Sequence, residues 1–171
     1  MTLPQPSERR KQRIELAEQR SRKRLAPVSV RLATGDGAKV VVTEAHTDRE
    51  GYITNMLDAF GTVSEAFGSE MLAQILTATA PAAGRPTEQS INAALALVEA
   101  VAPQNEIEAM LAVQMAATHS AAMMMLERAK TADGVPAMQQ YGTLATKHLR
   151  TFAVQIEVLS RTRRGSHVAA G

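Results

Sequence analysis

Four histidines are the side chains in this sequence best suited to acid–base or metal chemistry. His46 precedes an expected helix start and His167 lies near the last residue, so both are expected to be solvated. His119 and His148 lie on the edges of the apolar stripes of two long helical segments. If these segments form an antiparallel hairpin, the two imidazoles face each other beside Gln114. The simplest role is a hydrogen-bonded polar pair that fixes helix register, with a metal site, a pH-sensitive contact or catalysis as alternatives.

The sequence offers few other groups for catalysis. It has no cysteine, which excludes disulfides, thiolate nucleophiles and cysteine-based metal sites. A zinc site needs three or four ligands, and no carboxylate is placed beside the two histidines. Nucleophile-elbow, phosphate-loop and zinc-protease or calcium-loop motifs are also missing. We therefore expect a protein that is not an enzyme and has no metal or other cofactor.

Cationic side chains gather at the two ends of the chain. Residues 1–26 carry a net charge of +5, residues 27–145 of −7 and residues 146–171 of +4. Such ends can neutralise phosphates without reading base sequence, and residues 1–26 contain no aromatic ring to stack on single-stranded bases. A solvated tail, docking on the acidic body and an acidic protein partner are the alternatives. The predicted nucleic-acid-binding residues are Arg9, Arg10, Lys11, Arg13, Arg20, Arg22, Lys23, Arg24, Arg161, Arg163 and Arg164.

Residues 1–26 are expected to form a basic arm that is largely disordered or partly helical, because they lack an apolar stripe. A single helical domain over residues 27–164 is expected to follow. It begins with apolar and polar residues alternating over 28–32 and a β-branched run over 39–43. The intervening Asp36-Gly37 suits a tight turn, so the pattern predicts a β-hairpin at 28–44.

About five helices are expected after the hairpin, which makes the fold mainly α. Gly61 suits the left-handed cap at the end of the first, and Pro103 stops the third. The expected N-caps are Thr47, Thr62 (or a later start at Ser69), Thr87 and Asn105.

The last two expected helices are long, spanning about 105–131 and 136–164, with apolar residues at helical spacing. The short connection predicts an antiparallel αα-hairpin. Ala122, Gly142 and Ala145 are small enough to let the two backbones approach closely. Residues 165–171 are expected to be a disordered tail.

Composition bears on location and assembly. No signal peptide and no run of about 18 uninterrupted apolar residues is visible, so a cytoplasmic protein without membrane contact is expected. Nine methionines, abundant alanine and only 3% aromatic residues make a thin core. The methionine run at 123–125 spans more than one helix face. We therefore expect apolar surface to be buried against another copy, giving a homo-oligomer.

The segment 108–123, with the stretch Gln114-Met115-Ala116-Ala117-Thr118-His119, resembles a helix in uncharacterised small proteins from alphaproteobacterial genomes. The segment 145–165 fits the same pattern, and these proteins share a basic N-terminus and a short strand-like segment. The resemblance implies a shared helical hairpin and an association with prophage-like genes. It implies no activity, and features of the longer tail in those proteins are not carried over.

These observations favour a non-enzymatic, homo-oligomeric helical protein that contacts nucleic acid non-specifically through its basic ends, in the setting of a mobile element or prophage. One alternative is a structural or adaptor protein of a phage-like assembly, whose β-hairpin adds to a neighbouring sheet. The other is a metal-dependent enzyme built around His119 and His148, which predicts stoichiometric bound metal.

Overall fold

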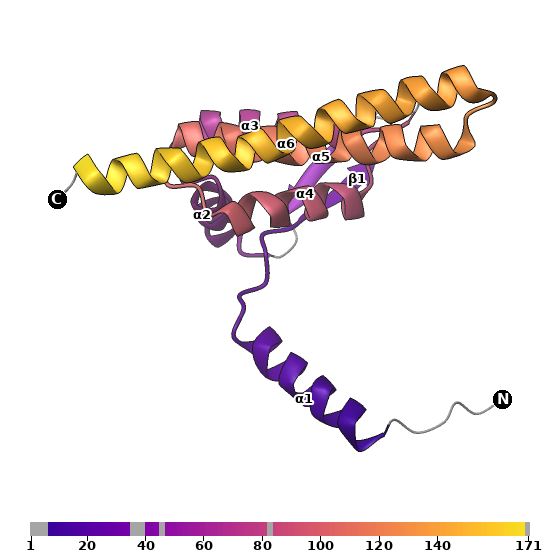
Figure 1. Cartoon of the computed structure of the whole chain (residues 1–171). Helices are drawn as coiled ribbons and strands as arrows, with labels where there is room; N and C mark the ends of the chain where they lie inside the picture. Colours follow the sequence, from indigo (N-terminus) through magenta and orange to yellow (C-terminus); the bar gives the residue numbers. More distant parts are fainter. Residues whose placement is uncertain (1–6, 35–39, 45–46, 82–83, 170–171) are drawn as a thin grey trace.

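The computed structural model describes residues 7–34, 40–44, 47–81 and 84–169. Within them lie a detached N-terminal helix, a two-stranded hairpin and a layered body of helices (Figure 1). This arrangement confirms the predicted mainly α fold with a hairpin near its start and a long helix pair at its end. The elements are α1 (Glu8–Arg22), β1 (Val30–Thr34), β2 (Val40–Glu44), α2 (Arg49–Ala59), α3 (Glu65–Thr79), α4 (Glu88–Val101), α5 (Glu106–Thr131) and α6 (Val135–Ala169).

The hairpin pairs β1 with β2 antiparallel, with Val30 opposite Glu44 and Leu32 opposite Val42. Its predicted turn at 35–39 lies outside the described residues. A lone hairpin is marginally stable in water, so this one depends on its contact with α4. Val30 is fully buried in that contact and joins the main core.

Side chains of α4 bind the outer edge of β1. Asn92 accepts a hydrogen bond from the Val30 N–H at 2.8 Å and donates one to the Val30 carbonyl at 3.1 Å. The Val28 and Leu32 amides lie two residues before and after Val30, and they donate to the carboxylates of Glu99 and Glu88, both at 2.8 Å. These polar side chains of α4 therefore satisfy a strand edge that would otherwise be open to pairing.

Two helix starts follow the predicted caps. The Thr87 hydroxyl accepts the Ser90 N–H in a capping box, and the side-chain oxygen Oδ1 of Asn105 accepts two amides of the first turn of α5. Two others were predicted wrongly by one or two residues. Asp48, not Thr47, caps α2 by accepting from Gly51, and the side chain of Ser64 caps α3. Short polar residues adjacent in sequence compete for one cap, and local pattern alone does not rank them.

Thr62 illustrates why α3 does not start at its predicted cap. Its hydroxyl donates to the Glu106 carboxylate at 2.7 Å and accepts the Ser64 N–H at 3.1 Å. The threonine therefore joins the corner between α2 and α3 to the start of α5. The hydrogen bond to Glu106, 44 residues further along the chain, therefore uses the hydroxyl that was predicted to cap α3.

Gly61 ends α2 as predicted. It has φ +58°, and the Gly61 and Thr62 amides donate to the Asp58 and Leu57 carbonyls, which is the Schellman pattern. A Cβ at this position would also collide with the Pro103 carbonyl. Glycine is required here both for backbone conformation and for the close approach of the loop between α4 and α5.

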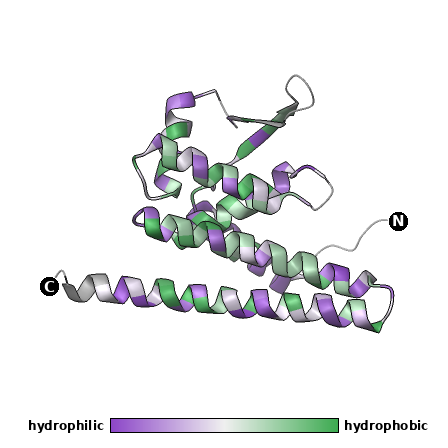
Figure 2. Ribbon diagram, turned by 90° about the horizontal axis from the view of Figure 1, so that it is seen from above, coloured by the Kyte–Doolittle hydropathy of each residue, from purple (hydrophilic) through white to green (hydrophobic). Residues whose placement is uncertain are grey.

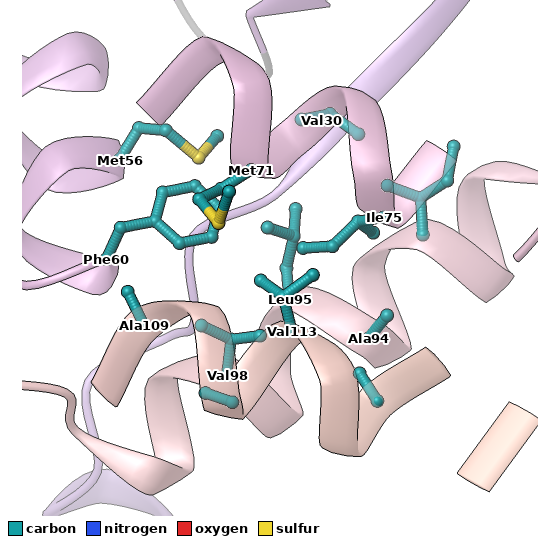
Figure 3. Close-up of a cluster of buried hydrophobic side chains, with 13 residues drawn as sticks. Val30, Met56, Phe60, Met71, Ile75, Ala94, Leu95, Val98, Ala109 and Val113 are labelled. Atoms are coloured by element: carbon teal, nitrogen blue, oxygen red, sulfur yellow. The ribbon is translucent and has the colours of Figure 1, made fainter. Parts of the chain in front are cut away.

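The core lies between α2, α3, α4 and the first half of α5. Phe60, Ile75, Ile91, Leu95 and Val98 are its largest fully buried side chains. Figure 3 shows methionines of α2 and α3 packed around Phe60, above small residues of α5. Alanine on α5 allows that helix to approach closely, so the expected thin, methionine-containing core is what forms.

The pair α5 and α6 forms the predicted antiparallel hairpin. By length and composition alone α5 is apolar enough to span a membrane, and it packs against α3, α4 and α6. Ala122 and Ala145 are fully buried between the two helices, as expected. Gly142 was predicted to lie there too, but a Cβ on it would touch nothing within 4 Å.

The last helix is longer than predicted. α6 continues to Ala169, so residues 165–169 are helical where a disordered tail was expected. No proline or helix-stopping cap follows Arg164, and the glycine at 165 is tolerated within the helix. Figure 2 shows α6 along one edge of the molecule beside α5, with hydrophobic and hydrophilic residues interspersed along it.

Candidate nucleic-acid interface

The helix α1 projects from the body on an extended linker and buries none of its side chains (Figure 1). Its sequence is rich in Arg, Glu, Gln and Lys, which favour helix without needing a core. Lys11 pairs with Glu8 at 2.8 Å, and Arg22 with Glu18 at 3.7 Å, at helical spacing. Local propensity and these exposed pairs are therefore what hold α1 together.

The charges of α1 divide into two faces. At 100° per residue, Arg9, Arg13 and Arg20 lie within about 40° of one another. The acidic residues and their partners Lys11 and Arg22 lie on the opposite face. Among the described residues, none of the three arginines takes part in an ion pair. We call Arg9, Arg13 and Arg20 the arginine stripe.

The remaining cations of the arm lie beside or beyond this stripe. Arg10 lies next to it on α1, and Lys23 occupies the helix C-cap. Arg24 follows in the linker, and all three are exposed. The arm predicted from the sequence is thus one exposed helix whose unpaired positive charge lies mainly on one side.

The C-terminal arginines predicted for the same role have different surroundings. Arg161 pairs with Glu157 at 2.6 Å on the surface, and Arg164 is exposed. Arg163 instead turns inward and contacts Glu108 of α5. The structure therefore groups Arg161 and Arg164 on the surface of α6 and separates Arg163 from them.

Arg163 connects three elements. Its Nη2 and Nε donate to Glu108 Oε2 at 2.7 and 3.1 Å, and Nη2 also donates to the carbonyls of Val101 and Ala102 at 2.8 and 2.9 Å. These carbonyls end α4, where a cation is favoured by the helix dipole. The hydrogen bonds from Arg163 lower the pKa of the Glu108 carboxyl against the opposing effect of burial, and the Gln104 amide lowers it further.

Glu108 was not predicted to be a partner of Arg163. Its position predicted only a place in the first turn of α5, where a carboxylate is favoured by the helix dipole. The residue is only 4% exposed, which is unusual for a glutamate without a partner. The sequence alone does not show that Glu108 faces Arg163, because this depends on the register of the α5–α6 hairpin.

The register of the α5–α6 hairpin also determines whether His119 and His148 face each other. His119 lies against Phe152, with ring centroids 5.8 Å apart, rather than against His148. Phe152 is one helical turn beyond His148, and the pair 108–163 has the same offset. Within the part of the chain that the structure describes, no hydrogen bond joins His119, His148 and Gln114, and Gln114 is exposed. The three predicted partners are therefore not brought together.

An open depression of about 570 Å³ lies between the α2–α3 corner and the α4–α5 corner. Asp58, Glu99 and Glu106 are the acidic residues that line it. Two of their carboxylates stabilise the fold, since Glu99 accepts from the Val28 amide and Glu106 accepts from the Thr62 hydroxyl. The Thr62 hydrogen bond lowers the pKa of Glu106. Among the described residues, no group of three or more histidine, aspartate or glutamate side chains is placed to hold a metal ion.

Comparison of the chain with protein-family models, with curated proteins and with solved structures found no match. The role of the chain must therefore be argued from its own side chains. Of the features described above, the arginine stripe is the one whose chemistry points outward to a ligand.

Proposed function

We propose that this protein is a non-enzymatic, homo-oligomeric helical protein that binds nucleic acid non-specifically through α1. The observation that carries the proposal is the arginine stripe, which is exposed and carries no intramolecular ion pair among the described residues. When these unpaired cations bind phosphates, no ion pair within the chain has to break, so binding takes no stabilising contact from the fold. Surface ion pairs such as Lys11–Glu8 contribute less, because their charge is already partly neutralised.

The dimensions of the stripe suit a phosphate backbone. Arg9 and Arg20 are eleven residues apart, or about 16 Å along the helix axis at 1.5 Å per residue. Phosphates on one strand of duplex DNA rise by about 3.4 Å each, so the stripe spans roughly five of them. Arginine donates several hydrogen bonds in a fixed fork that fits phosphate oxygens. α1 contains no aromatic side chain to stack on bases, which favours backbone contact without sequence preference.

Additional copies of the chain would strengthen this contact. One arm neutralises few phosphates, so its affinity for nucleic acid is weak and falls further as salt rises. Two arms on one oligomer bind with the effective concentration set by their linkers, which raises affinity without any new contact. Residues 23–29 supply such a linker between α1 and β1.

The test compares two double variants with equal loss of charge. Arg13→Gln with Arg20→Gln removes two members of the stripe, while Lys11→Gln with Arg22→Gln removes two paired cations from the other face. Binding to fluorescent duplex DNA is measured by anisotropy across a salt series. The slope of log K against log salt is negative. We expect the stripe variant to reduce its magnitude by about 2, and the control variant to reduce it by less than about 1.

Equal effects of the two variants would mean that total charge, not the stripe, determines binding. Full retention of binding in the stripe variant, or absence of binding by the wild-type chain at low salt, would refute the proposal. If the wild-type chain does not bind DNA at low salt, an acidic protein becomes the favoured partner of α1.

A second candidate function is that of a structural or adaptor protein in a phage-like assembly, and the edges of the hairpin favour it. The outer edge of β1 is occupied by Asn92, Glu88 and Glu99. Within the described residues the sheet has two strands, so the outer edge of β2 is left for an added strand. A large, salt-insensitive assembly that ignores DNA would support this candidate over the first.

A further inference from the structure

The outer side of α6, turned away from α5, carries four exposed cations. Ala145 and Leu159 are buried and mark the inner side of the helix, which packs on α5. With 100° per residue, the four cations lie within about 100° of one another, on the side opposite those two residues. Arg163, whose guanidinium contacts Glu108, lies on the inner side instead. We call these four exposed residues the α6 basic face: Lys147, Arg150, Arg161 and Arg164.

The positive charge of the α6 basic face is nearly uncompensated. Glu157 is the only acidic residue between Val135 and Ala169, and it pairs with Arg161 at 2.6 Å. The other three members of the face take part in no ion pair among the residues that the structure describes. Like charges three or four residues apart on a helix repel each other. The fold gains nothing from such an arrangement, whereas an anionic ligand would be attracted by it.

The α6 basic face consists of two cation pairs on one continuous helix. Lys147 and Arg150 form the first pair, Arg161 and Arg164 form the second, and each pair lies within one helical turn. Arg150 and Arg161 are eleven residues apart, or about 16 Å along the axis at 1.5 Å per residue. The major groove of duplex DNA is about 12 Å wide, with a phosphate backbone on each side. Long cationic side chains at the two ends of this gap can therefore reach both backbones of one groove.

We propose that the outer side of α6 is a second binding surface for duplex nucleic acid, where the two cation pairs bind phosphates on the two sides of a major groove. Lys147 and Arg150 were not among the predicted binding residues, because in the sequence they stand apart from the arginine-rich end. The aromatic residues of α6 face inward, since Tyr141 lies against Arg128 of α5 and Phe152 lies against His119. The surface therefore offers phosphate contacts without stacking on bases.

This second surface rests on the proposed function and extends it beyond α1. Figure 1 shows α6 along the top of the body and α1 projecting below it. The arginine stripe and the α6 basic face are therefore separate surfaces of one chain. Each neutralises few phosphates, but two surfaces on one chain can hold two segments of a long duplex and bind it more tightly than either alone.

The first test removes one cation pair and compares it with an equal loss of charge elsewhere. Lys147→Gln with Arg150→Gln neutralises the first pair, while Arg31→Gln with Arg85→Gln neutralises two exposed cations outside α6. Anisotropy of fluorescent duplex DNA is measured with the full chain across a salt series. We expect the α6 variant to reduce the magnitude of the negative slope of log K against log salt by about 2, and the control variant by less than about 1. Equal reductions, or an unchanged slope in the α6 variant, would overturn the proposal.

Glu157→Gln should act in the opposite direction. It removes the acidic residue of the outer side and frees Arg161 for a phosphate, so the magnitude of the slope should rise by about 1. Glu127→Gln is the matched control, because Glu127 is an exposed glutamate on α5. A rise of the same size in both variants would show that net charge, rather than the α6 basic face, determines binding.

Thiol protection locates the bound duplex on the helix. The chain has no cysteine, so each introduced thiol is unique. Val154 lies between the two cation pairs and is 56% exposed, and Ile156 is 44% exposed and lies about 160° around the helix from it. With duplex DNA at about ten times its dissociation constant, the maleimide reaction of Val154→Cys should slow by about tenfold, since only the unbound protein reacts. Ile156→Cys should react at nearly the rate seen without DNA.

Equal protection of the two thiols, or none at Val154→Cys, would contradict binding on the outer side of α6. The same assay with vesicles of anionic phospholipid tests the other polyanionic surface that four cations could meet. Protection of Val154→Cys by these vesicles but not by duplex DNA would assign the α6 basic face to a membrane and overturn the proposal.

Variants of the two surfaces separate this inference from the proposed function. If the arginine stripe variant weakens DNA binding and the α6 variant does not, α1 keeps its role and the second surface is rejected. If only the α6 variant weakens binding, the phosphate contact lies on α6 and the role of α1 is rejected. A wild-type chain that does not bind duplex DNA at low salt rejects both.

Discussion

Replacement of Arg163 by alanine should destabilise the fold although the residue lies near the end of the chain. The side chain makes two hydrogen bonds to buried Glu108 and one each to the last carbonyls of α4. Breaking a buried ion pair by removing one partner typically costs about 3–5 kcal/mol. The Arg163 side chain is 35% exposed, so water will partly solvate the glutamate left behind. We therefore expect a loss of about 2–3 kcal/mol at neutral pH.

Chemical denaturation followed by circular dichroism measures this loss directly. In a chain of this length, it also corresponds to a fall in Tm of roughly 4–10 °C. Arg161→Ala is the matched control, because Arg161 pairs with Glu157 on the surface of the same helix. It should cost less than about 0.5 kcal/mol. If the two variants are equally stable, the contact between Arg163 and Glu108 does not hold α4, α5 and α6 together.

The pH dependence provides a second, independent check. Arg163 lowers the pKa of Glu108 in the folded wild-type protein below its ordinary value of 4.5, so this group's stabilisation is present above pH 4.5 and is lost as pH falls through the lowered pKa. Without Arg163, burial raises the pKa, and the variant should gain stability as pH falls toward 4.5. The free-energy gap between wild type and Arg163→Ala should therefore narrow on acidification. A gap that stays constant from pH 7 to about pH 4 would refute this account of Glu108.

Three further changes test the corners of the fold, each by the free energy of unfolding in denaturant. Ala102→Gly should stabilise by about 0.5–1 kcal/mol, because Ala102 has φ +50° in the left-handed region that glycine adopts freely. Gly61→Ala should destabilise by more than about 2 kcal/mol, since its φ is +58° and its Cβ would collide with the Pro103 carbonyl. Asn92→Ala should cost about 1–3 kcal/mol by leaving the Val30 amide and carbonyl unpaired, and hydrogen exchange at Val30 should accelerate.

The features predicted correctly from the sequence are those fixed by neighbouring residues. The cap at Thr87, the cap at Asn105 and the left-handed glycine at 61 depend on a few adjacent positions. The hairpin was visible for the same reason, because a period of two and a turn sequence are local. Its attachment to α4 was not visible, since Asn92 is an unremarkable residue in a helical pattern until Val30 lies beside it.

The register of the α5–α6 hairpin marks the limit of such reasoning. Pairing Thr131 with Pro136 at the loop placed His119 opposite His148. In the structure the loop carries α6 one turn further, which places Phe152 there instead. A shift of four residues leaves every apolar stripe intact, because position i+4 lies on the same helix face. Hydrophobic pattern therefore predicts that the helices pair but does not fix which residues meet.

The same limit applies to charge. From the number of cations alone, Arg163 was grouped with Arg161 and Arg164 at a basic end of the chain. In the structure, however, Arg163 is paired with Glu108 inside the fold. The same reasoning also grouped Lys11 and Arg22 with the arginine stripe, although both have acidic partners on their own helix. A polyanion can bind only those cations that lack an acidic partner, and on α1 these are the arginine stripe and Arg10 beside it. A ligand that binds there should therefore approach α1 from a single side, and the acidic face of α1 should remain turned to solvent.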